Sequence, residues 1–393
     1  MEFSSLNTSE SASQKPPTQE DQPLPGDAVY AWYRSIRESQ PVFYDTESGA
    51  WLVFRYDDVQ QILLDPATFS SRRDDPSDNP LGASILGSDP PRHRQLRNLA
   101  TQAFTPRTVA RLEPRITSIV NDLLDQVADK GEMEVIRDLA FPLPVTVIAE
   151  LLGIPVADQR QFKQWSEAIV GISEEAYLTA QQEMALYFLS LIAQRRSVPQ
   201  DDLITALIEA EVDGEHLPDM ELLGFCILLL VAGHETTTNL IGNAILCFDE
   251  HPHVMDELRA EPALLPSAIE EVLRYYSPVK SLGRIATVDT VLRGQHIKAG
   301  QFVLPIFSSA NRDEEQFPNA NTFDIRRIPN RHIAFGHGIH FCLGAPLARL
   351  EARIALGAVL ERFSHIRRDR SVPLQLKESG VIFGLQSLPV TFG

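Results

Sequence analysis

The sequence predicts a mainly α-helical fold with a small β part, and three observations support this prediction. From residue 92 to residue 273, apolar side chains recur at helical spacing and are interrupted mainly at prolines and glycines. Residues 281–304 instead alternate apolar and polar side chains, as strands do. The chain has 393 residues, 44% of them hydrophobic, so it can bury a large core. No internal repeat or interdomain linker is evident in the sequence, which favours one domain over residues 26–393.

The N-terminal part of the chain changes from polar to structured at about residue 26. Residues 1–25 are rich in Ser, Thr, Gln, Glu and Pro and lack an apolar core, so we expect a disordered tail and neither a signal peptide nor an anchor. The elements predicted next are a helix at 28–38, a hairpin with strands at 41–44 and 50–54, a helix at 57–65 and a loop at 70–91.

The C-terminal part returns from strands to a loop and then to a helix. Turn dipeptides containing glycine at 293–294 and 299–300 divide the strand region into short strands. The elements predicted after them are a loop at 311–335, a helix from about residue 345 to near Phe363, and a weak strand at 380–385.

Charge and cysteine content limit the class of protein. The net charge of −18 argues against a nucleic-acid-binding protein, which would normally carry a basic face. Three cysteines, Cys226, Cys247 and Cys342, are too few and too far apart for a secreted disulfide framework. The longest apolar run, 222–233, is shorter than the roughly 18–20 residues that span a bilayer. We therefore expect a soluble cytoplasmic protein that does not interact with membranes.

Cys342 lies in a glycine-rich loop, Phe335-Gly-His-Gly-Ile-His-Phe-Cys-Leu-Gly344, directly before the predicted helix. A thiol at a helix N-terminus is close to free backbone N–H groups and to the positive end of the helix dipole, which favour the thiolate. The thiolate is the form that binds a metal. The glycines allow tight turns and a close approach of the backbone to a flat partner.

This loop resembles the haem-ligand loop of the cytochrome P-450 family, because Phe335, Gly338, His340, Cys342 and Gly344 fill every place in the family's motif. The resemblance implies the P-450 fold, a single triangular-prism domain, with haem b bound through Cys342 as the metal ligand and the other four residues next to the cofactor. Cys342 could instead be a buried free cysteine or a nucleophile with a neighbouring base. Haem ligation explains more, because it also accounts for the glycines and the helix start.

A second motif, Ala232-Gly-His-Glu-Thr236, interrupts an apolar helix with a glycine, an acid and a hydroxyl. Glycine costs about 1 kcal/mol relative to alanine within a helix, and buried polar groups need partners. Taken alone, the motif could be an exposed polar patch on a surface helix. It resembles the oxygen-binding groove of the P-450 family. The resemblance implies that Ala232 and Gly233 leave room for dioxygen, and that Thr236 and Glu235 are the catalytic pair that delivers protons.

A third pair, Glu271 and Arg274, lies on one face of a predicted helix. Such pairs are usually surface contacts worth a fraction of a kcal/mol. In the P-450 family the same spacing marks a buried structural ion pair that an arginine before the haem loop completes. By this resemblance we expect Arg327, rather than Arg326, to complete it.

The resemblance also assigns haem propionate contacts to His93, Arg97, Arg284 and His340. His93 and Arg97 are four residues apart and therefore share a helix face. Arginine suits a carboxylate because its planar fork binds two oxygens at once. Each residue taken alone could equally be a solvated surface charge.

Two further groups follow from the same resemblance. Six arginines are expected around the cysteine side of the haem, where they would attract an acidic electron donor, although each could be an ordinary surface residue: Arg92, Arg94, Arg107, Arg111, Arg349 and Arg353. The substrate pocket is expected to be mostly apolar, which predicts a hydrophobic substrate: Ile85, Leu86, Leu228, Val231, Ala232, Leu282 and Ile382.

The sequence therefore predicts a soluble, monomeric bacterial monooxygenase, similar to P-450s of bacilli that hydroxylate fatty acids, terpenoids and steroids. No flavin or nicotinamide motif is present, so we expect electrons from an NAD(P)H-dependent reductase through a ferredoxin or flavodoxin. One alternative is a peroxygenase that uses hydrogen peroxide directly, against which Glu235 and Thr236 argue. A non-catalytic haem sensor or carrier is the alternative from another class.

Overall fold

The computed structural model describes residues 26–72, 80–170, 173–212 and 214–393, and helices make up most of it. The helices are α1 (Asp27–Ser39), α2 (Tyr56–Leu64), α3 (Pro80–Ala83), η1 (Ile85–Gly87), α4 (Arg92–Ala103), α5 (Pro106–Ala110), α6 (Glu113–Ala128), η2 (Ile136–Ala140), α7 (Pro142–Leu151), η3 (Val156–Asp158), α8 (Gln159–Val170), α9 (Glu174–Ser197), α10 (Leu203–Glu209), α11 (Asp219–Glu250), α12 (Pro252–Ala260), η4 (Pro262–Leu264), α13 (Leu265–Tyr275), α14 (Phe307–Ala310), η5 (Gly338–His340) and α15 (Ala345–Arg362).

The strands are short. They are β1 (Val42–Asp45), β2 (Ala50–Val53), β3 (Phe69–Ser70), β4 (Glu132–Glu134), β5 (Glu211–Val212), β6 (Glu215–His216), β7 (Arg284–Ala286), β8 (Thr290–Leu292), β9 (Gln295–Ile297), β10 (Phe302–Pro305), β11 (Arg367–Arg368) and β12 (Pro389–Thr391).

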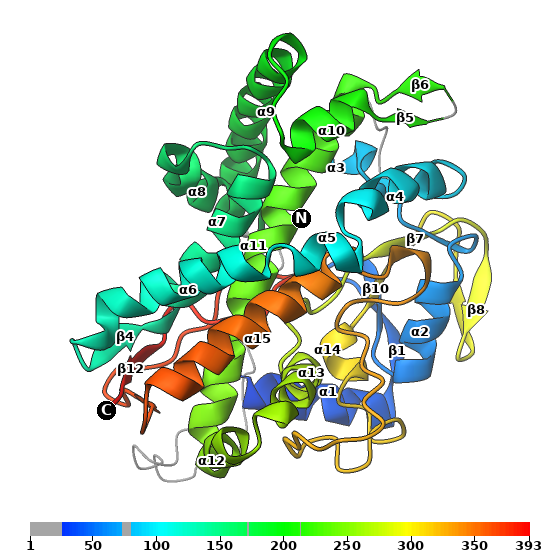
Figure 1. Ribbon diagram of the computed structural model, residues 1–393. Coiled ribbons are helices and arrows are strands. Elements are labelled where there is room, and N and C mark those ends of the chain that lie inside the picture. The colour runs from blue at the N-terminus through cyan, green and yellow to red at the C-terminus, as the bar shows by residue number, and fades with distance from the viewer. Residues whose placement is uncertain (1–25, 73–79, 171–172, 213) are drawn as a thin grey trace.

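The long helix α11 forms the centre of the molecule and runs through its full height in Figure 1. It begins after Pro218 with acidic residues in its first turn and ends before Pro252, which are usual start and stop signals. Among the described helices, α11 is long and apolar enough to cross a membrane, but 61% of its most apolar window is buried inside the protein. Because its apolar residues surround the helix, α11 is a core helix that other helices enclose.

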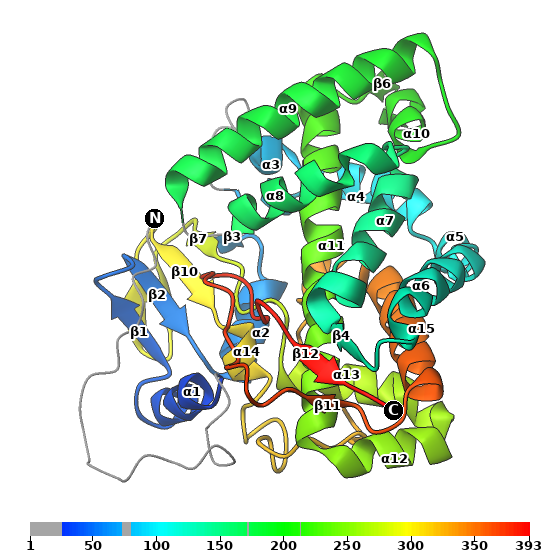
Figure 2. The ribbon, with the colours of Figure 1, turned by 90° about the vertical axis from the view of Figure 1, so that its left-hand side faces the viewer.

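Helices and sheet occupy different sides of the molecule (Figure 2). Helices α7, α9, α13 and α15 pack against α11, and α6 runs beside α15. The five-stranded sheet has the order β1-β2-β10-β7-β3, in which only β10 and β2 are parallel. Val303 of β10 lies opposite both Trp51 and Arg284, so the sheet joins the N-terminal hairpin to the region around residue 284.

Most of the predicted elements are confirmed. Helices α1 and α2, the hairpin β1–β2, the short strands β7–β10 and the helix α15 lie within about two residues of the predicted bounds. The predicted tail at 1–25 lies outside the described residues.

Two predictions of local structure are wrong. The region 70–91 is not a continuous loop, because it contains α3 and η1 as well as the end of β3. Residues 380–385 form only isolated bridges, and the C-terminal strand is β12, which pairs with β4 and β11. Its partner β4 lies about 250 residues away in the chain, so local sequence carries no signal for this pairing.

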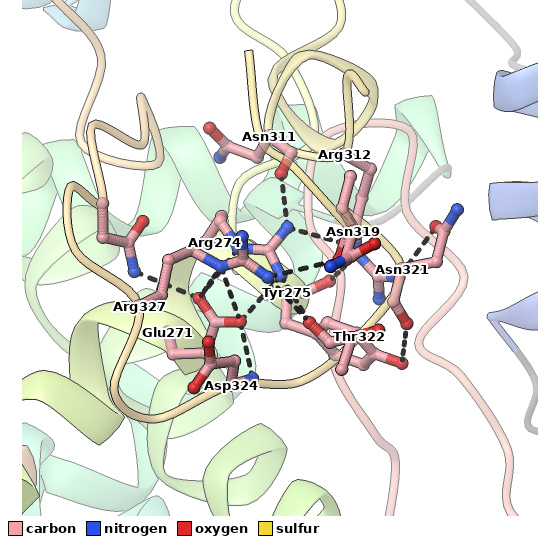
Figure 3. A network of polar contacts seen from close by, with 12 residues as sticks. Glu271, Arg274, Tyr275, Asn311, Arg312, Asn319, Asn321, Thr322, Asp324 and Arg327 are labelled. Atoms are coloured by element: carbon pink, nitrogen blue, oxygen red, sulfur yellow. Dashed lines mark hydrogen bonds and ion pairs between the residues drawn. The ribbon is translucent and has the colours of Figure 1, made fainter. Parts of the chain in front are cut away.

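A buried ion-pair network connects α13 to the loop before Cys342 (Figure 3). Glu271 and Arg274 are fully buried, and Arg274 donates to both carboxylate oxygens at 2.7 and 2.8 Å. Arg327 Nε lies 3.2 Å from both oxygens of Glu271, whereas Arg326 is exposed and pairs with Glu257 and Glu261.

The other N–H groups of Arg274 and Arg327 hydrogen-bond to backbone carbonyls of the loop 311–327. Arg274 donates to the carbonyls of Asn311, Ala320 and Thr322, and Arg327 donates to those of Pro318, Asn319 and Thr322. The loop 311–327 lacks regular structure, so these charge-assisted bonds replace the ladder that a helix or sheet would provide.

We predict that Arg327→Ala lowers the free energy of unfolding by about 3 kcal/mol, because it leaves the buried Glu271 carboxylate with one fewer cation. The matched variant Arg326→Ala should change it by less than about 0.5 kcal/mol, since its ion pairs are exposed. Urea unfolding of the two variants and the parent measures the difference. Equal destabilisation by the two substitutions would contradict the buried role of Arg327.

Candidate active site

The loop that carries Cys342 is shaped by two glycines with positive φ. Gly336 has φ +72° and Gly338 has φ +70°, a region that other residues adopt only with strain. At Gly338 a Cβ atom would lie 2.6 Å from the carbonyl oxygen of Leu63, so α2 and the loop can meet only at a glycine. The backbone N–H of Cys342 donates to the carbonyl of Phe335 at 2.9 Å, which closes the loop.

The sulfur of Cys342 lies at the start of α15. The backbone N–H groups of Gly344 and Ala345 hydrogen-bond to it, and Arg97 and Arg349 add positive charge nearby. Burial nevertheless raises the pKa of the Cys342 thiol, and these groups oppose the rise only in part. The sulfur therefore lies at a helix start as predicted, but in the protein without a metal the effect of burial on the pKa of the thiol is larger than that of the helix start. A coordinated metal cation would deprotonate the thiol.

A cavity of about 720 Å³ connects this loop with α11. Its walls are mainly apolar and come from α11, α15, the Cys342 loop, the segment 278–284 and residues 380–382. Of the residues predicted to be in the site, those that line the cavity are Ile85, Leu86, Arg97, Leu228, Val231, Ala232, Gly233, Glu235, Thr236, Leu282, Arg284, Phe335, His340, Cys342, Gly344 and Ile382.

The predicted residues His93 and Gly338 lie behind the cavity wall. The ring of His93 is 4.3 Å from that of His340, centroid to centroid, and His93 is buried with no recorded hydrogen-bond partner at Nε2 among the described residues. His340 Nε2 is 3.0 Å from the hydroxyl of Ser71.

Positive charge gathers at this wall. Burial lowers the pKa of Arg97, although Cys342 opposes the shift. The pKa of His340 falls to about 3, first through burial and then through Arg284, His93 and Arg97. His340 is therefore neutral, and the positive charge comes from Arg97 and Arg284, so a group that carried carboxylates would be stabilised here by their guanidinium groups.

The acid and hydroxyl of α11 both have partners in this structure. Thr236 Oγ1 donates to the carbonyl of Ala232 at 2.8 Å. Glu235 is 1% exposed, forms an ion pair with Lys377, and lies 3.8 Å from Nε2 of His234. Glu235 is thus buried, so the alternative of a polar patch on a surface helix does not fit it.

Gly233 has a second role that the sequence did not indicate. A Cβ at this position would lie 2.6 Å from Cδ1 of Ile148, so the glycine lets α7 approach α11 closely. Gly233 also lines the cavity, as predicted.

The resemblance also leads us to expect that the region 169–180 caps the pocket, and Ile169, Tyr177 and Leu178 line the cavity. Sequence reasoning missed several other lining residues, which are apolar: Leu63, Leu81, Phe104, Ile148, Phe225, Leu229 and Leu240. The helical period of α11 could have identified three of them, because Phe225, Leu229 and Leu240 fall on the face that carries Ala232 and Thr236. The segment from 169 to 178 gave no such signal, and residues 171 and 172 lie outside the described residues.

The predicted basic patch is only partly present. Arg92, Arg349 and Arg353 form ion pairs with Glu221, Glu270 and Glu113 respectively, so an acidic partner would have to compete with these carboxylates. Arg94, Arg107 and Arg111 are exposed. Sequence alone did not indicate the pairing, because the three acids lie on other elements, between 79 and 240 positions away in the chain.

The helical fold and the apolar cavity beside Cys342 are those expected of a haem-thiolate protein, and comparisons with known proteins identify the family. A family model described as "Cytochrome P450" matches residues 41–196 and 174–392, and the chain belongs to this family. Putative cytochrome P450 YjiB of Bacillus subtilis is 46% identical over 372 residues, which are 92% of this chain and 93% of that protein. Erythromycin C-12 hydroxylase of Saccharopolyspora erythraea is 43% identical over 383 residues, covering 93% of this chain and 95% of that protein.

Solved structures show the same fold. CYP109E1 from Bacillus megaterium in complex with testosterone has a TM-score of 0.90 and 42% identity, covering 95% of this chain and 99% of that chain. CYP109B1 from Bacillus subtilis has a TM-score of 0.82 and 45% identity, and the match covers 92% of this chain and 98% of that chain. The predicted P-450 fold is therefore confirmed.

The family binds haem b through a cysteine thiolate, and its members named here include a hydroxylase. The chain is a cytochrome P450 monooxygenase, as the sequence predicted. Its own residues fit the cofactor: the Cys342 thiol, which has two N–H donors, faces an apolar cavity that Arg97 and Arg284 also line.

We predict that Gly338→Ala reduces the haem bound per protein and lowers the thermal midpoint, because its Cβ would clash with the backbone of α2. Gly336→Ala is the matched control: its φ is almost the same, but the nearest atom to its Cβ is 3.7 Å away. Both variants carry a backbone strain of about 1–2 kcal/mol, and only the first adds the clash. Absorbance of the haem against total protein measures the loss, and equal losses in the two variants would contradict this account.

Proposed function

We propose that this protein is a soluble, cytoplasmic monooxygenase that hydroxylates a hydrophobic small molecule of the fatty acid, terpenoid or steroid class. The observation that carries the proposal is the mainly apolar cavity between Cys342 and α11. A similar structure holds testosterone, which supports a substrate of steroid size and polarity. The balanced reaction is RH + O2 + 2e⁻ + 2H⁺ → ROH + H2O.

Cys342 would hold the haem, which supplies the chemistry that activates dioxygen. Arg97, Arg284 and His340 would bind its carboxylates, with His93 supporting His340 from behind. Gly344 would let the backbone approach the cofactor, Gly338 would let the loop pack against α2 behind it, and Phe335 would pack beside the sulfur.

Glu235 and Thr236 would deliver the two protons that the reaction consumes. The Thr236 hydroxyl lines the cavity and can both donate and accept, so it can pass on a proton that it receives. Glu235 lines the same cavity from the neighbouring position and can supply protons as a general acid. Ala232 and Gly233 are small, which leaves space beside the hydroxyl.

The apolar wall would select the substrate. Ile85, Leu86, Leu282 and Ile382 come from three separate segments, and their side chains would contact the substrate together with those of Leu228, Val231 and Ala232 on α11. Such a wall favours hydrophobic molecules, because burying apolar surface is worth about 25 cal/mol per Å².

Electrons would come from an NAD(P)H-dependent reductase through a ferredoxin or flavodoxin, one at a time. Arg94, Arg107 and Arg111 are exposed, and α5, which carries Arg107, packs against α15. These arginines would attract an acidic donor to a monomeric protein. A peroxygenase that uses hydrogen peroxide directly would not need Glu235 and Thr236, and their place on the cavity wall favours the dioxygen route.

The substrate class can be tested by screening fatty acids, terpenes and steroids for a change in haem spin state, followed by analysis of the products. The proposal requires hydroxylated product from at least one ligand that causes the change, with NAD(P)H, a reductase and a ferredoxin. Product formed with hydrogen peroxide but never with the redox partners would favour the peroxygenase.

We predict that Thr236→Ala still consumes NAD(P)H but diverts it to hydrogen peroxide, so that product formed per NAD(P)H falls by about tenfold. The neighbouring Thr237→Ala is the control, since Thr237 also lines the cavity and also bonds back to its own helix. Its ratio should stay within about twofold of the parent. Tight coupling in Thr236→Ala would refute the proton-delivery role.

A further inference from the structure

Lys377 is the partner of Glu235, and it comes from a part of the chain that no sequence motif marked. Its Nζ donates to Glu235 Oε1, and the two residues are 142 positions apart. The Glu235 side chain is 2% exposed and that of Lys377 is 18% exposed, so the pair is largely removed from water. A carboxylate in such a place needs a cation or hydrogen-bond donors, and Lys377 supplies them.

Lys377 lies on a two-armed turn of residues 375–386, which we call the C-terminal hairpin. Lys377 N donates to the Gly384 carbonyl and Gln386 N donates to the Gln375 carbonyl, both at 2.9 Å. Leu376 and Leu385 form a bridge between the arms. Lys377 therefore has a fixed position relative to Gly384 on the other arm.

The hairpin is in turn fixed against α11. A Cβ at Gly384 would lie 2.0 Å from Oδ1 of Asn239, so the backbone touches this side chain. Asn239 is four residues after Glu235 and shares its helix face. Gly384 contacts Asn239, and Lys377 pairs with Gly384 across the hairpin. Lys377 therefore reaches α11 at Glu235, one helical turn before Asn239.

The tip of the same hairpin lines the cavity through Gly380, Val381 and Ile382. Lys280 holds the tip: its N–H donates to the Val381 carbonyl at 2.7 Å, and its Nζ donates to the Ser379 carbonyl. One short element therefore both shapes the cavity and carries the cation that faces Glu235.

We propose that Lys377 is the positioning residue of Glu235: it holds the acid in the orientation from which protons reach Thr236. This inference rests on the proposed function of Glu235. Among the described residues, the charged and titratable groups that face Glu235 are Lys377 and His234. Lys377 holds Oε1 of Glu235, Oε2 lies 3.8 Å from Nε2 of His234, and the residue lines the cavity beside Thr236. Loss of the ammonium would release the acid from this orientation.

The test compares Lys377→Met, which keeps the length and removes the charge, with Lys377→Arg, which keeps the charge. Lys298→Met is the matched control, because Lys298 also pairs with an acid, Asp289, but on the surface. In Lys377→Met we expect product per NAD(P)H to fall about fivefold, with recovery to within about twofold in Lys377→Arg and no change in Lys298→Met. Peroxide-supported turnover and the ligand-induced spin change should stay within about twofold of the parent, because neither depends on proton supply from Glu235.

A double-mutant cycle shows whether Lys377 acts through Glu235. Added to Glu235→Gln, Lys377→Met should reduce the coupling ratio no further, and it should lower the thermal midpoint of the holoprotein less than it does in the parent. The proposal would be overturned if Lys377→Met kept product per NAD(P)H within twofold of the parent. It would also be overturned if this variant lost peroxide-supported turnover as strongly as it lost product per NAD(P)H, or if the effects of the two substitutions were additive in the cycle. If Glu235→Gln alone leaves the coupling unchanged, the proposed proton role of Glu235 fails first, and the two failures are thereby distinguished.

Discussion

The buried carboxylate of Glu271 fixes the part of the molecule on which the site depends. It binds Arg274 and Arg327 and also accepts from Asn330 Nδ2 at 3.1 Å and from the backbone of Asp324 at 2.9 Å (Figure 3). These bonds connect α13 with an irregular loop that has no ladder of its own. The loop continues directly into the turn that presents Cys342, so a displacement at Glu271 would be passed to the sulfur. This explains why a charge cluster with no place in the chemistry is so fully buried.

The cavity combines one rigid wall with one wall that contains exchangeable contacts. On the Cys342 side, glycine geometry and backbone hydrogen bonds leave little freedom. On the α11 side, Lys377 holds Glu235, while the Thr236 hydroxyl bonds to a carbonyl of its own helix and can exchange this contact without unfolding the helix. Such a division suits an enzyme that must hold a metal ligand still and yet let protons move.

Sequence alone predicted the fold class and most of the site because the informative residues are contiguous. The ten-residue loop to Gly344 and the run from Ala232 to Thr236 each contain their whole signal, and the helical pattern placed the loop directly before a helix and the run within one. Contacts between distant segments could not be predicted. The C-terminal hairpin was expected to be a strand, Lys377 was not considered, and three arginines expected in a basic patch are paired with acids of other elements. These outcomes depend on tertiary packing, which overrides local propensity.

We propose above all that the sulfur of Cys342 would hold the haem iron. The most direct measurement is the spectrum of the reduced carbon monoxide complex of purified Cys342→Ser, compared with that of the parent at equal haem content. Thiolate ligation predicts that the parent shows the red-shifted band and that the variant loses it, because an alcohol oxygen donates less electron density to iron than a thiolate. If the variant kept the red-shifted band, the sulfur would not be the ligand and the assignment of the cavity would fail with it.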